Sequence, residues 1–112
     1  MMQGMPEDIH ENAKHDAIWQ RALMSNVCLL CTRTCTVELR ESTAIFYCPA
    51  CAPYGISRPA LVRLAGLGAA HRQLLRQFVH HAYLTSALLV INVGADNGFR
   101  LVRTTPPFAT SP

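Results

Sequence analysis

The chain has 112 residues and a formal net charge of +3, and half of its residues are hydrophobic. This length fits one domain spanning residues 1–112, and the composition excludes a disordered chain. The sequence has no apolar run approaching the roughly 20 residues of a membrane span, and its acidic opening has no signal-peptide core. We therefore expect no membrane partner and a cytoplasmic protein, or a nuclear one in a eukaryotic or viral setting.

Charge is distributed unevenly along the chain. Residues 1–41 hold six acids against four bases, whereas residues 42–112 hold six arginines against Asp96 alone. Binding of a zinc ion by four thiolates would add −2 and bring the whole protein to about +1. These values argue against a strong overall electrostatic field, but they leave room for a local basic face.

Residues 6–24 are predicted to form a helix, because apolar residues such as Ile9, Ala13 and Ile18 recur with the helical period. Pro6 suits the first turn of such a helix, and the two acids that follow it favour the N-terminal end of the helix dipole. Trp19 is expected to pack against whatever this helix covers.

Residues 27–52 carry two Cys-x-x-Cys pairs, Cys28–Cys31 and Cys48–Cys51, separated by sixteen residues. The β-branched and aromatic residues between the pairs predict a hairpin that returns the second pair beside the first. Zinc prefers four thiolates at tetrahedral corners, so we expect one structural zinc ion bound by all four cysteines. The alternatives are buried free cysteines, disulfides and a redox pair. A reducing compartment argues against disulfides, and the lack of a larger α/β pattern argues against a redox pair. Cys35 is expected to be a free strand cysteine, although its replacement of Cys31 as a ligand stays open.

This arrangement resembles the zinc-ribbon and treble-clef class of four-cysteine zinc fingers over residues 27–52, and Cys48-Pro-Ala-Cys51 resembles the usual knuckle of that class. The chain departs from the class at Thr32 and Ala52, where such knuckles often carry glycine. A more distant likeness is to the zinc module of the C subunit of the flagellar transcriptional activator. That module has similar pair spacing, an aromatic residue before the third cysteine, and Pro and Ser-Arg after the fourth, here Phe46-Tyr47, Pro53 and Ser57-Arg58. The likeness implies a role in transcription regulation.

The remainder of the chain predicts a connector over residues 53–57, a helix pair over 57–84, a β-hairpin over 86–104 and a loose tail over 105–112. The predicted buried stripe of the second helix consists of Leu74, Leu75, Phe78, Val79, Ala82 and Tyr83. We therefore expect an α+β fold in which an N-terminal helix precedes a four-cysteine zinc ribbon and a helix pair and a β-hairpin follow it. This order also suits a winged helix-turn-helix.

The polar face of the second helix is the favoured functional surface. Arginine and glutamine pair with base edges, and arginine also pairs with phosphates, so a DNA- or RNA-binding regulator is the first hypothesis. Its predicted nucleic-acid-binding residues are Arg72, Gln73, Arg76, Gln77, Arg100 and Arg103, of which the last two would lie on a wing.

The alternative is a protein-interaction adaptor or inhibitor that docks on a larger complex through the N-terminal helix or the apolar strand 88–93. If that strand lies at a sheet edge, it would also pair with a second copy of the chain; burial of the strand in the chain's own core is the other interpretation. The sequence contains no recognised catalytic motif, and a zinc ion with four cysteine ligands has no open position. We therefore expect no enzymatic activity.

Overall fold

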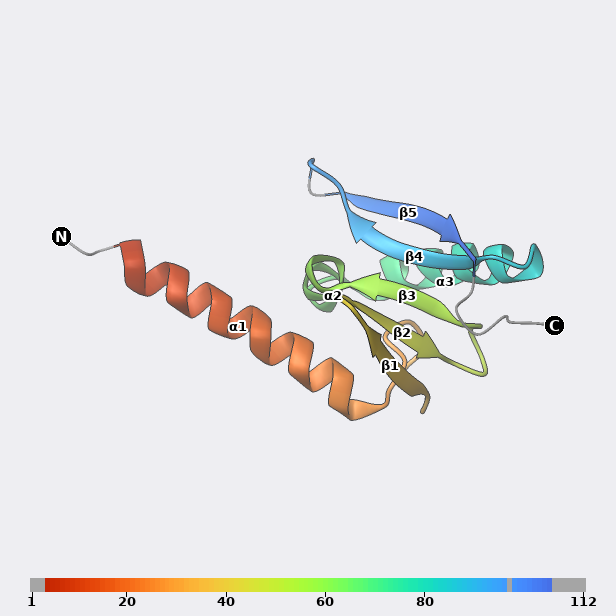
Figure 1. The fold of residues 1–112 in the computed structure, drawn as a ribbon, viewed down its shortest axis with the longest axis horizontal. Helices are drawn as coiled ribbons and strands as arrows, with labels where there is room; N and C mark the ends of the chain where they lie inside the picture. The colour runs from red at the N-terminus through yellow and green to blue at the C-terminus, as the bar shows by residue number, and fades with distance from the viewer. Residues whose placement is uncertain (1–3, 97, 106–112) are drawn as a thin grey trace.

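The computed structural model describes residues 4–96 and 98–105, with side chains described from residue 13 onward. Within these residues the chain forms three helices and a single five-stranded mixed sheet, which confirms the expected α+β class (Figure 1). In chain order the elements are α1 (Gly4–Ser25), β1 (Thr36–Arg40), β2 (Thr43–Tyr47), β3 (Tyr54–Ser57), α2 (Arg58–Ala65), α3 (Ala69–Leu84), β4 (Leu88–Val93) and β5 (Phe99–Thr104). The expected tail beyond Thr105 lies outside the described residues.

The five strands lie side by side in the order of the chain. All neighbouring pairs are antiparallel except β3 and β4, which run parallel and are connected through α2 and α3. Ser57 ends β3 and caps α2 at once, because its hydroxyl accepts a hydrogen bond from the Ala60 amide at 3.4 Å. The helix pair is therefore the crossover that parallel strands require.

The existence of β3 was not predicted, because residues 53–57 were expected to be a connector. Tyr54 and Ile56 are fully buried, and Gly55 pairs with Ile45 on one side and Val90 on the other. A Cβ on Gly55 would lie 3.3 Å from Cγ2 of Val90, so glycine allows the side chains of the neighbouring strands to close over it. Four residues are too few to show the alternation of apolar and polar side chains that marks a strand. This strand is also held by partners that are distant in the sequence, which local patterns do not reveal. It joins the cysteine-bearing half and the C-terminal hairpin into one sheet.

The hydrophobic core lies between one face of the sheet and the three helices. Alternate residues of the central strands face it, and α2 and α3 pack behind the sheet in Figure 1. From α1, Trp19 and Ala22 join this cluster, as expected for the tryptophan. The fully buried members with the largest side chains are Tyr54, Phe46, Ile56, Leu61, Leu64, Ile91 and Val79.

Only part of the predicted stripe on α3 is buried. Leu75, Val79 and Ala82 face the core, as expected, but Leu74, Phe78 and Tyr83 are exposed. The prediction was wrong for these three because helical periodicity alone cannot fix the width of the covered stripe. Because α3 packs against the sheet from one side only, a narrow stripe of its surface is covered and the residues at the margins of the predicted stripe stay exposed.

The strand over residues 88–93 is interior, as the interpretation of burial in its own core expected, and it has no open edge for pairing with a second copy of the chain. β4 is hydrogen-bonded to β3 on one side and to β5 on the other, so the edges of the sheet are β1 and β5. The C-terminal hairpin is likewise continuous with the larger sheet and does not stand apart as a wing. Its turn includes a hydrogen bond from the Gly94 amide to the Gly98 carbonyl at 2.7 Å.

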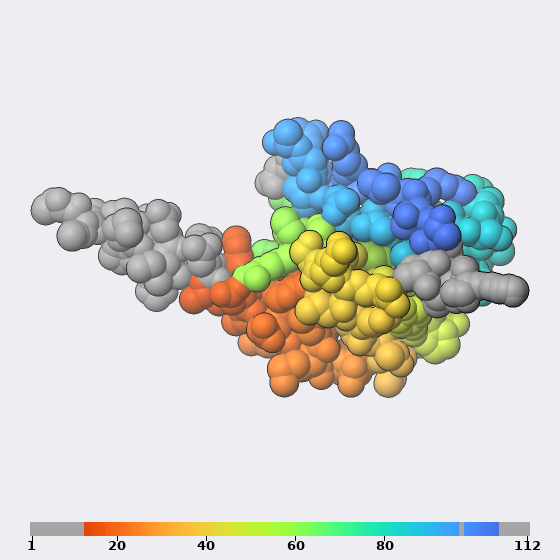
Figure 2. Space-filling model, in the orientation of Figure 1, coloured from red at the N-terminus to blue at the C-terminus, as the bar shows by residue number. Residues whose placement is uncertain are grey.

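The second face of the sheet is the one that α2 and α3 leave open. Figure 2 shows this side, where the yellow atoms of β1–β2 and the blue atoms of β4–β5 reach the surface. Arg100 belongs to this face, because it alternates with Leu101, which packs against the core. No helix among the described residues combines the length and apolarity needed to cross a membrane.

The burial of β3 gives a test of the joined sheet. We expect Ile56→Ala to lower the free energy of unfolding by about 2–5 kcal/mol, because its fully buried side chain packs where β2, β3 and β4 meet. Val102→Ala is the control: this β5 side chain is 41% exposed, and its loss should change stability by less than about 0.5 kcal/mol. Urea unfolding of the metal-loaded protein measures both, and equal small effects would contradict the assignment of residues 54–57 to the core.

Candidate metal centre and the groove beside it

Two loops with the same local geometry present the four cysteines. The first loop follows α1 and is closed by a bridge between Val27 and Thr34, whereas the second connects β2 to β3. In each loop the amide that follows the second cysteine donates to the carbonyl of the first. These hydrogen bonds run from Thr32 N to Cys28 O and from Ala52 N to Cys48 O, both at 2.9 Å.

Both positions where the sequence lacks the usual glycine have left-handed backbone. The φ angle is 63° at Thr32 and 89° at Ala52. A side chain with a Cβ is disfavoured there, because the Cβ approaches the carbonyl oxygen. The turns therefore keep the conformation that glycine would favour, at a steric cost that the rest of the site must offset.

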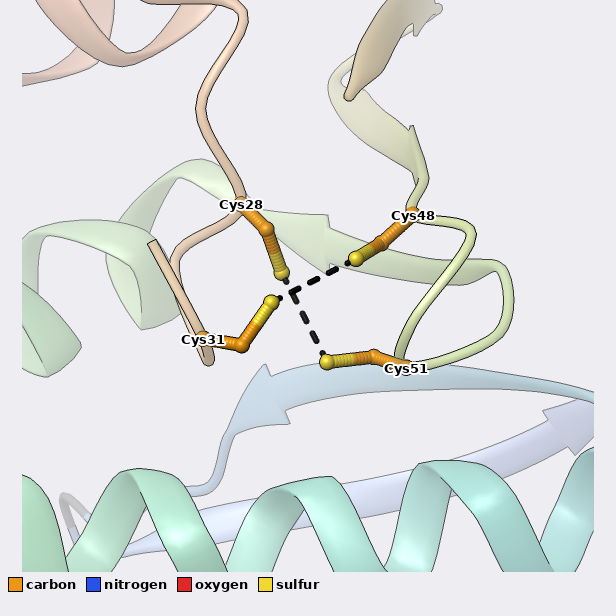
Figure 3. A group of neighbouring side chains, drawn as sticks. All are labelled: Cys28, Cys31, Cys48 and Cys51. Atoms are coloured by element: carbon orange, nitrogen blue, oxygen red, sulfur yellow. Dashed lines mark hydrogen bonds between the residues drawn. The ribbon is translucent and has the colours of Figure 1, made fainter. Parts of the chain in front are cut away.

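The four sulfurs converge on one point (Figure 3). All four ligand atoms lie within 4.8 Å of one another; Cys28 Sγ is 3.9 Å from Cys51 Sγ, and Cys31 Sγ is 3.5 Å from Cys48 Sγ. A tetrahedral centre with Zn–S bonds of about 2.3 Å has sulfurs about 3.8 Å apart. The spacing therefore fits a metal ion of zinc's size.

The surroundings of the thiols also favour a bound cation. Cys28, Cys48 and Cys51 are buried, and burial raises the pKa of the Cys28 and Cys51 thiols, with repulsion from neighbouring thiolates adding to the effect. At Cys31 burial acts in the same direction, but hydrogen bonds from the Arg33 backbone and from the other three thiols outweigh it and lower the pKa to about 7. Four thiolates gathered here are stable only with a compensating positive charge, which a divalent metal supplies.

Cys35 stands outside this group. The four cysteines named above form the cluster found among the described residues, and Cys35 is not a member. Its side chain is buried in the core cluster, and burial raises the pKa of its thiol to about 11. The thiol is therefore protonated and unreactive at neutral pH, as expected for a free strand cysteine.

Tyr54 is a site residue that sequence reasoning missed. Its Oη lies 3.3 Å from Cys28 Sγ and accepts a hydrogen bond from the Leu29 amide at 3.1 Å. A Cys28 thiolate can only accept, so in that form it receives the Tyr54 hydroxyl, and it also receives the Leu30 amide at 3.4 Å. The fully buried ring stacks on Phe46 with centroids 5.3 Å apart. Such outer contacts orient a ligand, and the only sequence signal was an aromatic residue three positions after Cys51.

A groove runs between the second cysteine loop and α3. One part, of about 280 Å³, is lined by Ala50, Cys51, Gln73, Arg76, Gln77 and His80. The adjoining part, of about 590 Å³, shares Ala50 and His80 and is otherwise lined by Thr34, Cys35, Thr36, Tyr47, Cys48, Pro49, Ala52, Pro53 and Tyr83. Figure 3 shows α3 passing beneath Cys51. The polar side of α3 thus faces the metal centre.

The six predicted nucleic-acid-binding residues do not share one surface. Gln73, Arg76 and Gln77 line the groove, whereas Arg72 turns inward and donates a hydrogen bond to the Leu64 carbonyl at 3.5 Å. Arg103 donates to the Thr85 hydroxyl at the end of α3, and Arg100 lies on the open face of the sheet. The spacing along α3 could not show which of its arginines point toward the protein.

The strained turn at Ala52 gives a test of the loop geometry. We expect Ala52→Gly to raise the free energy of unfolding of the zinc-loaded protein by about 1 kcal/mol, because glycine removes the Cβ clash at φ 89°. Ala50→Gly, in the same loop but without positive φ, should not stabilise and serves as the control. Urea unfolding midpoints measure the difference; a loss of stability in Ala52→Gly would show that this turn is not strained.

The four cysteines are thus placed by two equivalent turns on one connected core. Comparison of the chain with family models, with curated proteins and with solved structures found no match. The assignment therefore depends on the geometry of the chain itself, which is that of a four-cysteine metal site for which zinc is plausible.

Proposed function

We propose that the chain is a zinc-stabilised nucleic-acid-binding regulatory protein built around a four-cysteine zinc ribbon. Two cysteine turns that face each other beside paired strands support the ribbon assignment. Four soft thiolates with tetrahedral spacing support zinc as the metal.

The proposed role of the zinc ion is structural. Four protein ligands leave no open coordination position, so the ion would neither activate water nor bind a substrate. Its binding would instead contribute folding free energy, of the order of 10 kcal/mol in apparent terms for sites of this kind. We therefore propose a binding protein and not an enzyme.

The observation that carries the nucleic-acid proposal is the composition of the groove beside the metal centre. Arg76, Gln73 and Gln77 provide donors for phosphates and base edges. No Asp or Glu occurs among the described residues that line either part of the groove. A concave surface with donors and without acids suits an anionic ligand.

The test is a mobility-shift assay of the zinc-loaded protein on a mixed pool of labelled DNA and RNA. We expect a shift at low salt that disappears as salt is raised, because phosphate binding releases counterions. Arg76→Gln should weaken binding about fivefold or more, whereas Arg63→Gln, at an exposed arginine of α2 away from the groove, should leave it unchanged. Arg72 is unsuitable for this test because it contacts the Leu64 carbonyl. A protein that shifts no nucleic acid at low salt would contradict the proposal.

A protein-interaction adaptor is the second candidate, and the flank of α3 outside the groove favours it. Leu74 and Phe78 lie one turn apart there, with 52% and 45% of their surfaces exposed. An apolar pair of this kind suits docking on a larger complex. The test is a complex with a protein partner that survives high salt. If Phe78→Glu abolishes this complex and Arg76→Gln does not, the adaptor role replaces the nucleic-acid proposal.

A further inference from the structure

We propose that the groove between the second cysteine loop and α3 binds single-stranded nucleic acid and not a duplex. This inference depends on the proposed function and specifies its ligand. The groove runs along the flank of α3 beside the second cysteine loop, where Arg76 is half-buried and Gln73, Gln77 and His80 are exposed.

The orientation of α3 argues against insertion of this helix into a duplex groove. A recognition helix must point its base-reading side chains away from the protein. Here both arginines of α3 are half-buried: Arg72 contacts the Leu64 carbonyl, and Arg76 lies beside Cys51. The side of the helix opposite its buried residues carries Gln73 and Gln77, which are exposed, and no arginine. A flexible single strand can follow the groove to the half-buried Arg76, whereas a rigid duplex would meet the glutamines and gain few phosphate contacts.

The lining of the groove matches what single strands need. Unpaired bases bind by stacking on aromatic rings, which tolerates any sequence. Tyr83, His80 and Tyr47 line the wider part, and Tyr83 is 51% exposed. The Tyr47 hydroxyl donates to Glu38, a carboxylate that also pairs with Arg40 at 3.1 Å, so its charge is partly offset. Together the two parts have room for bases beside these rings, with Gln73 and Gln77 within the same groove.

Charge sets the expected strength and salt response. A zinc ion with four thiolates carries −2, and Arg76, beside Cys51, would offset part of that charge. One arginine therefore provides few phosphate contacts, and stacking must supply most of the affinity. For single strands each phosphate contact gives a slope of about −0.7 in log affinity against log salt, so we expect a slope between about −0.7 and −1.4.

The experiment uses fluorescence anisotropy of the zinc-loaded full chain with labelled single strands of randomised sequence, about 12 nucleotides long, as DNA and as RNA. A duplex of the same length is the comparison probe. Tyr83→Ala and Arg76→Gln test the groove. Phe78→Ala is the matched control for the tyrosine, since it removes a similarly exposed aromatic side chain from the same helix but outside the groove. Arg100→Gln is the control for the arginine, because it lies on the open sheet face.

We expect single strands to bind at least tenfold more tightly than the duplex. Tyr83→Ala should weaken binding about 5- to 150-fold, the range for the loss of one stacked base, whereas Tyr83→Phe, Phe78→Ala and Arg100→Gln should bind normally. Zinc content and unfolding midpoint are checked for every variant, and His80→Ala provides a second groove variant if Tyr83→Ala does not fold.

Each contrary result has a distinct meaning. Equal or tighter binding of the duplex overturns the single-strand inference and leaves the proposed nucleic-acid function in place. If single strands bind but neither groove variant weakens the binding, the groove is not the binding site. Failure of every probe to bind overturns both the inference and the proposed function.

Discussion

The convergence of four thiols from two separate loops is the constraint on which the rest of the structure depends. Three of the four cysteines are buried within the same hydrophobic cluster that holds Phe46, Tyr54 and Ile56, so the metal centre and the core are one packing unit. The second cysteine loop leads directly into β3, and Ser57 at the end of β3 starts α2. Placement of that loop therefore fixes where the helices leave the sheet, and with them the groove along α3. A small core of this kind gains most from such a staple.

Local features of the sequence predicted most of the elements, whereas long-range pairing could not be predicted. The helical period of residues 6–24, the two Cys-x-x-Cys turns and the hairpin signals each involve neighbours in the chain, and all of these elements are present. The strand β3 is only four residues long and is held by β2 and β4, so nothing in its own sequence distinguished it from a connector. For the same reason the sequence of the apolar strand β4 left open whether it lies at an edge or in the core, and the structure places it between β3 and β5.

The candidate site shows the same division. Cysteine spacing was sufficient to name all four members of the sulfur cluster, whereas the exclusion of Cys35 came only from the structure. The contact of Tyr54 with Cys28 depends on how β3 lies beneath the first loop, which sequence spacing does not reveal. On α3, the helical period showed that polar and apolar side chains lie on different sides of the helix. Which side meets the cysteine loop depends on how the helix packs on β4. The predicted surface residues were therefore divided among the groove, the contact with the Leu64 carbonyl, the C-terminal end of α3 and the open face of the sheet.

Zinc K-edge X-ray absorption on the purified protein, with metal content measured on the same sample, tests the central claim most directly. The proposed zinc site requires one zinc ion per chain with four sulfur ligands at about 2.3 Å. A metal-free folded protein would contradict this account, as would a zinc ion with nitrogen or oxygen among its ligands, because either result would remove the four-sulfur centre from which the fold and the groove have been derived.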